Sequence, residues 1–205
     1  MHYHFTSRRN GCAIEPWNNW YHVTVHVYGS WLRGDPRGWR SRHHREHVEG
    51  DYKNPPPPGT YDNLYELSKA LMKRDPVKIA RELRQFIADA IAEKLIGDGI
   101  EVIVVSMDAK HLHVLARFPD RRPRYWMGWA KKYATQKLKA HGLAVGLNLQ
   151  LGEGIWAKRG HEEPVADRPH QLHATRYILN HRKRGAAVWV CGALRKSARV
   201  IIRER

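Results

Sequence analysis

The chain has 205 residues, and its 36 Lys and Arg outnumber its 20 Asp and Glu, which gives a formal net charge of +16 and a pI of about 10.1. Hydrophobic residues make up 42% of the chain, enough to form a core, so a wholly disordered protein is excluded. The charge favours a polyanionic partner, most simply nucleic acid. No stretch approaches the roughly 18 apolar residues of a spanning helix, so we expect no membrane partner.

The amino-terminal segment and the cysteines indicate a reducing compartment. Residues 1–17, MHYHFTSRRNGCAIEPW, lack the apolar core of a secretory signal. Cys12 and Cys191 are far apart and have no neighbouring cysteine, so neither a disulfide framework nor a zinc motif is indicated. We therefore expect a cytoplasmic protein.

The first predicted strand is WYHVTVHVYG, residues 20–29. It alternates between a polar face with His22, Thr24 and His26 and an apolar face with Val23, Val25 and Val27. Residues 30–74 follow as an insertion of extended, turn-rich structure, since the four prolines of NPPPPG exclude regular helix or ladder pairing. A short helix is expected at 60–72. The insertion's HHREH segment holds three histidines that could suggest a second metal site: His43, His44 and His47. Because two of them are adjacent, no cysteine assists and the surroundings are rich in arginine, a phosphate-contacting loop is favoured instead.

Three longer helices and further strands are predicted downstream. The first helix starts at Asp75-Pro76, an N-cap followed by proline, and stops at Gly97 and Gly99. Strands at 101–106 and 111–118 form a hairpin. A second helix opens at Pro123; weak strands are expected at 145–151 and 155–159. The third helix runs from near Pro169 to Gly185, before a short strand in AAVWVCG and a basic tail at 192–205.

This order predicts an α+β fold, a ferredoxin-like βαββαβ antiparallel sheet followed by a C-terminal helix. We expect one domain over 1–205, with 30–74 inserted after the first strand. No internal repeat is visible at the periods typical of solenoids.

Two histidines in the strand HLHVLARF form the first chemical feature. His111 and His113 are two apart, so they share one face, while Leu112, Val114 and Ala116 occupy the other. Such a pair alone is more often ordinary structure than a metal site.

The second feature lies on the third helix. Tyr177 and His181 are four apart and share a helical face, which His173 and His170 extend. A chain with 14 histidines could carry this stripe as a solvated face, but both features together favour a site. The apolar residues of this helix are expected to face the core: Leu172, Ile178 and Leu179.

These segments resemble a known family. HLHVLARF together with RYILNHRKRGAAVW is similar to the HUH single-tyrosine transposases, in particular the REP-associated tyrosine transposases, whose segments read H-x-H-hydrophobic and YI-x-x-N-x-x-x-x-G. YHVTVHVYGSWLRGDPRGW also resembles the first strand and loop of some members. The resemblance covers residues 20–40 and 76–190, in the same order.

The resemblance implies a metal-dependent endonuclease and strand-transferase that acts on hairpin-forming single-stranded DNA. Tyr177 would be the nucleophile and form a covalent 5′-phosphotyrosine intermediate. His111 and His113 would bind Mg²⁺ or Mn²⁺. The third ligand would be His181, although many members carry asparagine and Asn180 precedes it, so both remain candidates. The protein would be nucleoid-associated when bound to DNA, as a monomer or a homodimer with the tyrosine acting in cis or in trans.

A basic surface interleaved with aromatic residues is expected to bind the nucleic acid, because cations follow phosphates and aromatic rings stack on unpaired bases. Trp126 and Trp129 are expected in the core, whereas Tyr133 and Trp156 could stack. The predicted binding residues are Arg117, Arg121, Arg122, Arg124, Lys131, Lys132, Arg176, Arg182, Lys183 and Arg184.

Two other functions fit the sequence in part. A non-catalytic single-stranded DNA- or RNA-binding module on the same fold would explain the charge, although no aromatic-rich RNA-recognition motif is visible. Metal-dependent hydrolysis of a small substrate would explain neither the charge nor the tyrosine.

Overall fold

The computed structural model describes residues 17–36, 39, 57–143, 147 and 154–192, and a five-stranded antiparallel sheet runs through them. The strands pair in the order β4-β1-β3-β2-β5. The predicted ferredoxin-like α+β fold is confirmed, and β5 extends the sheet beyond β2. The strands are β1 (Trp20–Val27), β2 (Glu101–Met107), β3 (His111–Arg117), β4 (Trp156–Pro164) and β5 (Ala187–Val190).

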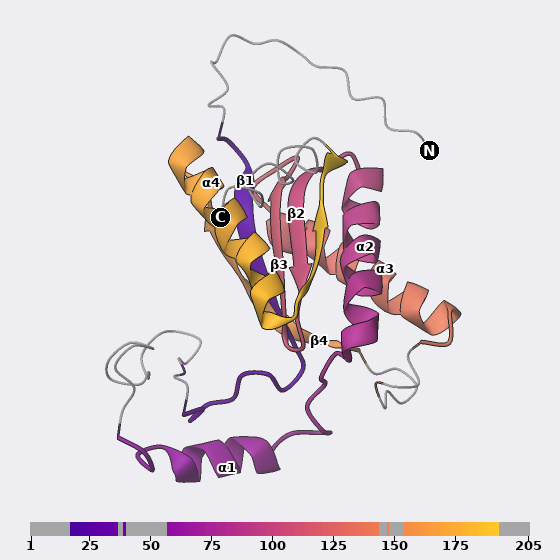
Figure 1. Cartoon of the computed structure of the whole chain (residues 1–205). Helices are drawn as coiled ribbons and strands as arrows, with labels where there is room; N and C mark the ends of the chain where they lie inside the picture. The colour runs from indigo at the N-terminus through magenta and orange to yellow at the C-terminus, as the bar shows by residue number, and fades with distance from the viewer. Residues whose placement is uncertain (1–16, 37–38, 40–56, 144–146, 148–153, 193–205) are drawn as a thin grey trace.

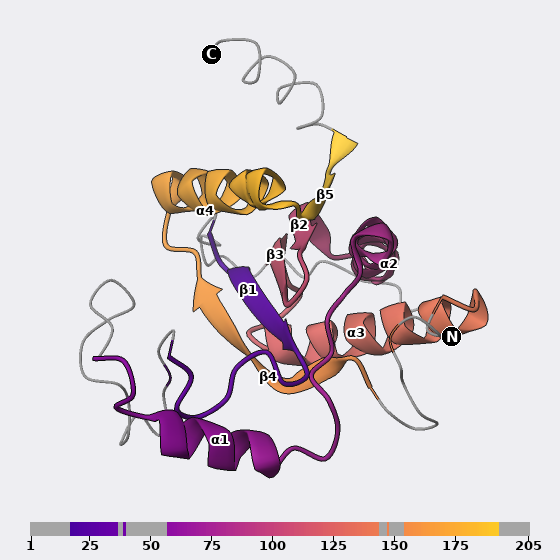
Figure 2. The same cartoon turned by 60° about the horizontal axis from the view of Figure 1, so that its bottom comes forward.

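The helices divide between the two faces of the sheet (Figures 1 and 2). α2 (Arg81–Gly97) and α3 (Pro123–Ala140) cover one face, and α4 (Arg168–Asn180) covers the other. A 3₁₀ turn, η2 (His181–Arg184), continues α4 into β5. The short helix α1 (Asp62–Ala70) lies away from the sheet in both views. Within the described ranges, none of the helices is both long enough and apolar enough to cross a membrane.

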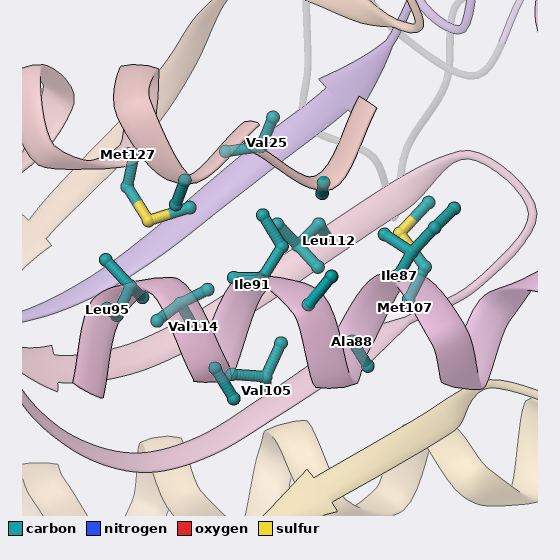
Figure 3. Close-up of a cluster of buried hydrophobic side chains, with 14 of the residues drawn as sticks. Val25, Ile87, Ala88, Ile91, Leu95, Val105, Met107, Leu112, Val114 and Met127 are labelled. Atoms are coloured by element: carbon teal, nitrogen blue, oxygen red, sulfur yellow. The ribbon is translucent and has the colours of Figure 1, made fainter. Parts of the chain in front are cut away.

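The larger core lies between the sheet and the helices α2 and α3 (Figure 3). Alternate residues of β1 and β3, among them Val25, Leu112 and Val114, point toward Ile87 and Ile91 of α2. A smaller apolar cluster lies under α4 and includes Leu115 of β3 and Ile178 of α4. The polar residues of β1 and β3 therefore belong to the α4 face, where apolar packing covers only part of the sheet.

The first long helix begins later than predicted. Residues 75–80 are not helical, and the N-cap of α2 is Ala80, without a side-chain cap. The backbone N–H of Val77 donates to the Tyr28 carbonyl at 2.9 Å, and that of Ile79 donates to Ala109 at 2.9 Å. These bonds, together with burial of both apolar side chains, outweigh the local cap signal of Asp75-Pro76.

The third helix is divided in two. Asp167 caps its start by accepting a bond from the His170 N–H at 2.8 Å, α4 ends at Asn180, and the 3₁₀ turn follows. Gly185 then adopts a φ of 80°, the left-handed conformation that favours glycine, and turns the chain into β5. The predicted end at Gly185 therefore corresponds to the end of the turn.

Two core predictions are wrong. Leu172 is 39% exposed and Trp129 is 45% exposed, because each lies on the outer side of its helix. Ile178 is fully buried, and Leu179 and Trp126 are partly buried against core clusters. Several other predictions lie outside the described residues: the histidines His43, His44 and His47, almost all of the strand at 145–151, and the tail from residue 193.

Candidate active site

Strand pairing gathers the predicted histidines on the α4 face. In the antiparallel register of β1 and β3, Thr24 lies opposite His113 and His26 lies opposite His111. Directly paired residues share a face, so the polar alternation of β1 and the H-x-H pair of β3 form one surface. The rings of His26 and His111 are 4.9 Å apart, centroid to centroid.

Tyr177 of α4 lies over this surface within the same chain. The centroid of its ring is 4.9 Å from that of His181, 5.6 Å from that of His113 and 5.8 Å from that of His22. The tyrosine itself is 44% exposed, whereas the three imidazoles beneath it are largely buried. The helix thus presents a partly accessible phenol at the wall of a histidine cluster.

His111 is oriented by the turn that precedes it. Its Nδ1 lies 3.2 Å from Oδ2 of Asp108, while Oδ1 of Asp108 accepts the backbone N–H groups of Lys110 at 2.7 Å and His111 at 2.6 Å. Burial opposes ionisation of this carboxyl, yet the hydrogen bond from His111 and the two backbone bonds hold the pKa of Asp108 well below its usual range. An ionised carboxylate therefore faces Nδ1 of His111.

His113 is more deeply buried and has two partners. Its Nδ1 lies 3.1 Å from the Thr24 hydroxyl and 3.2 Å from Nε2 of His22. Burial, followed by the neighbouring imidazoles of His22 and His181, lowers the pKa of His113 to about 3. Burial likewise lowers the pKa of His22 to about 4, against the opposing effect of Glu163. Both imidazoles are thus held neutral near pH 7.

His181 completes the cluster from η2. Its ring centroid is 4.4 Å from that of His113, and the residue is only 6% exposed. Among the described residues, neither ring nitrogen of His181 has a hydrogen-bond partner, and the same holds for the buried hydroxyl of Ser106 opposite His113 in β2. Asn180 is exposed. Of the two candidates for a third ligand, only His181 lies at the cluster.

The donor chemistry fits a divalent cation. Both His111 and His113 engage protein groups through Nδ1, and no bond to Nε2 of either ring occurs in the described part of the chain. Neutral imidazoles with an oriented second nitrogen are common metal ligands. As the side chains stand, however, no group of three or more His, Cys, Asp or Glu in the described ranges is arranged to hold an ion. The nitrogens of His181, buried and without partners, are the observation that favours a further ligand there.

Most of the predicted basic residues around α3 are already paired. Arg124 donates two bonds to Glu162, at 2.8 and 2.7 Å, and Arg122 donates to Asp120. Lys131 donates to the Ala157 carbonyl at 3.4 Å, and burial lowers its pKa. These contacts stabilise the α3 face, which is opposite the face carrying Tyr177. Arg117 likewise donates to the Asn18 carbonyl, whereas Arg121 is exposed.

The second basic group lies beside the tyrosine. Arg176 precedes Tyr177 on α4, and Lys183 and Arg184 follow in η2; all three are exposed. Arg182 is also exposed, and it donates to the Val188 carbonyl at 3.4 Å. Cations therefore flank the phenol on both sides along the chain.

Four residues of the cluster were not assigned to a site from the sequence. The alternation of His22 and Thr24 was visible, and pairing of the first strand with the H-x-H strand in a ferredoxin-like sheet would have placed them together. Asp108 sits in the hairpin turn, where a carboxylate that binds backbone N–H groups is common. Glu163 has no local signal, because only the register of β4 with β1 sets it opposite His22.

The comparisons with known proteins include a structural likeness. No protein-family model and no curated protein matches the chain. The chain is similar to the solved structure of a REP-associated tyrosine transposase bound to a REP hairpin, with 16% sequence identity and a TM-score of 0.42, over 88% of this chain and 75% of that one. This is the kind of protein that the sequence motifs resemble.

Proposed function

We propose that this protein nicks and rejoins single-stranded DNA, with the help of a divalent metal ion, through a covalent bond to Tyr177. The observation that supports the proposal is the contact of the Tyr177 ring with those of His113 and His181 in one chain. A half-exposed phenol beside His181, whose two buried ring nitrogens have no hydrogen-bond partner among the described residues, is an unusual arrangement, since buried polar side chains ordinarily find partners within the protein. An attacking tyrosine beside metal-binding imidazoles explains it.

The proposed reaction exchanges one phosphate ester bond for another. The Tyr177 oxygen attacks the phosphorus of a DNA phosphodiester; a P–O bond to the tyrosine forms and the bond from phosphorus to the 3′ oxygen breaks. The products are a 5′-phosphotyrosine and a free 3′-hydroxyl. The phenolic proton leaves to solvent water, and the departing 3′ oxygen takes up a proton from solvent to become the hydroxyl. The reverse attack by a 3′-hydroxyl of another strand restores a phosphodiester without ATP, because the covalent bond conserves its energy.

The metal ligands in this proposal are His111, His113 and His181, with Mg²⁺ or Mn²⁺ as the ion. When bound, such an ion supplies positive charge next to the scissile phosphate. The chain's own part is to orient the imidazoles: Asp108 and the β1 side chains fix the rings of His111 and His113 from behind. The exposed cations Arg176 and Arg184 would attract the DNA backbone to the tyrosine.

The outer side of α3 is a second surface suited to single strands. Tyr125 is 50% exposed and Trp129 is 45% exposed. The guanidinium of Arg122 lies 5.4 Å from the centre of the Tyr125 ring, and the ammonium of Lys132 lies 5.3 Å from that of Trp129. Exposed aromatic rings beside cations can stack on unpaired bases while the charges contact phosphates. We propose that this surface, defined by Arg122, Tyr125, Trp129 and Lys132, holds single-stranded DNA.

The test is a covalent adduct on a denaturing gel. The wild-type protein is incubated with Mn²⁺ and labelled single-stranded oligonucleotides that carry hairpins, and Tyr177→Phe is compared with Tyr65→Phe. The control also removes a tyrosine hydroxyl, but on α1, away from the sheet and from both proposed DNA surfaces. We expect a labelled adduct with wild type and Tyr65→Phe and none with Tyr177→Phe, which should still bind DNA. An adduct formed by Tyr177→Phe would overturn the assignment.

A non-catalytic binding module is the second candidate, and the α3 surface is the observation that favours it, because it could hold a strand without any contribution from Tyr177. If no hairpin oligonucleotide gives an adduct with wild type, while Trp129→Ala weakens the binding of single-stranded DNA or RNA, the binding module is the better description.

A further inference from the structure

A chain of three side chains links an acidic residue at the sheet edge to His113. Oε2 of Glu163 in β4 lies 3.8 Å from Nδ1 of His22 in β1, and Nε2 of His22 lies 3.2 Å from Nδ1 of His113 in β3. Glu163 is directly opposite His22 in the β1–β4 register. His22 is 9% exposed and His113 is 6% exposed, so solvent does not compete strongly for the two ring nitrogens between them.

The geometry decides which nitrogen of each ring carries the proton. A neutral imidazole has one N–H and one bare nitrogen. The Glu163 carboxylate favours the proton on the nearer nitrogen of His22, Nδ1, which leaves Nε2 bare. Bare Nε2 can then only accept a bond, so the proton between the two rings belongs to Nδ1 of His113. Nε2 of His113 is left with its lone pair free.

We propose that Glu163 and His22 are positioning residues that hold His113 in the tautomer whose Nε2 can bind a metal ion. The inference deepens the proposed function and rests on it for the role of His113. The turn carboxylate of Asp108 has the same relation to His111, directly and without an intermediate ring. Two carboxylates, one in the hairpin turn and one on the edge strand, thus leave Nε2 bare on both residues of the H-x-H pair.

The Thr24 hydroxyl could instead favour the other tautomer of His113. It lies 3.1 Å from Nδ1 of His113 and could donate its own proton there, which would put the ring proton on Nε2 and block ligation. With His113 as the donor, the Thr24 oxygen instead shares the same N–H as a second acceptor. The other oxygen of Glu163 lies 3.6 Å from Nε2 of His170 on α4, so the carboxylate can serve both rings.

The tautomer can be measured directly in the metal-free protein. Long-range ¹H–¹⁵N correlation spectra distinguish a protonated ring nitrogen from a bare one, and a His113→Gln spectrum assigns the signals. We expect a protonated Nδ1 and a bare Nε2 on His113 in wild type. Glu163→Gln should shift part of the population to the other tautomer. Glu163 is 48% exposed at its side chain, so the substitution is compatible with folding.

The matched control is Glu162→Gln. Glu162 is the adjacent residue of β4, points to the opposite face and pairs with Arg124, so its substitution should leave the His113 signals unchanged. Thr24→Val tests the competing arrangement and should not move the ring proton to Nε2. A wild-type His113 that carries its proton on Nε2, or a Glu163→Gln spectrum identical to wild type, would overturn the proposal.

Metal affinity gives a second readout. Mutation of a residue that hydrogen-bonds to a metal-ligating histidine typically lowers the affinity for the metal by about 10- to 100-fold. We expect Mn²⁺ binding, measured by calorimetry without DNA, to weaken in that range for Glu163→Gln and to be unchanged for Glu162→Gln. The outcomes separate the two proposals: the predicted tautomer without a DNA adduct overturns only the nuclease, and an adduct together with a protonated Nε2 overturns only the positioning role.

Discussion

Burial distinguishes two histidines of the cluster from a third histidine on the same helix as Tyr177. His113 and His181 are buried beside one another, and burial lowers the pKa of both, so they are neutral bases or ligands at pH 7. His173 is exposed on the same helix as Tyr177. The same residue type therefore has different chemistry depending on whether it faces the sheet, and the neutral imidazoles of His113 and His181 are suited to bind a metal ion.

Substitution of His181 and of Asn180 tests which of the two is the third metal ligand. His181→Ala should weaken Mn²⁺ binding by more than about tenfold, because it removes buried nitrogens that have no partner among the described residues. Asn180→Ala, one residue earlier and exposed, should change the affinity less than about twofold. Calorimetric titration of both variants checks this, with circular dichroism to verify folding. Equal losses in the two variants would contradict the assignment of His181.

The element that positions the tyrosine is the segment α4–η2–β5. Ile178, next to Tyr177, is fully buried in the apolar cluster beneath α4, and this contact directs the tyrosine toward the histidines. At the other end, Gly185 allows the turn that brings β5 beside β2, and Arg84 of α2 donates to its carbonyl at 2.6 Å. Packing at one residue and backbone conformation at another together fix the helix over the site.

A core substitution in α4 tests how this helix is oriented on the sheet. Ile178→Ala should lower the free energy of unfolding by about 2 to 5 kcal/mol, because it leaves a cavity in a fully buried position. Leu172→Ala on the same helix, 39% exposed, should change it by less than about 0.5 kcal/mol. Urea unfolding followed by circular dichroism measures both. If Leu172→Ala proved as costly as Ile178→Ala, the orientation of α4 described here would be wrong.

The sheet separates two surfaces of the protein. One carries Tyr177 with the exposed cations of α4 and η2, and the other carries the aromatic residues and cations of α3. The net charge of +16 attracts polyanions to both. A strand long enough to reach both surfaces would pass around an edge of the sheet.

Salt dependence tests whether both surfaces contact DNA. Each phosphate contact to single-stranded DNA contributes about 0.7 to the slope of log affinity against log salt. Lys132→Gln on α3 and Arg184→Gln on η2 should each reduce the slope by about that amount, measured by fluorescence anisotropy. Arg124→Gln should have a smaller effect, because its guanidinium is already paired with Glu162. A slope that responds to only one of the first two variants would restrict binding to one surface.

Local sequence patterns predicted which strands and helices form more accurately than where they begin and end. The alternation of residues 20–29 and the hairpin of 101–118 correspond to β1, β2 and β3 within a few residues. The start of α2 was mispredicted, because burial of Val77 and Ile79 and their bonds to distant carbonyls overrode a local cap signal. The exposure of Trp129 was also missed, since helical spacing alone does not show how far a neighbouring element covers a helix.

Composition and the strand and helix periods are enough to fix the net charge, the shared face of His111 and His113 and the shared face of Tyr177 and His181. Whether the two faces meet depends on tertiary packing, because Ile178 must pack beneath α4 to bring them together. Tertiary packing also places His22 and Glu163 behind His113, because strand register is set by pairing between segments some 90 and 140 residues apart in the chain.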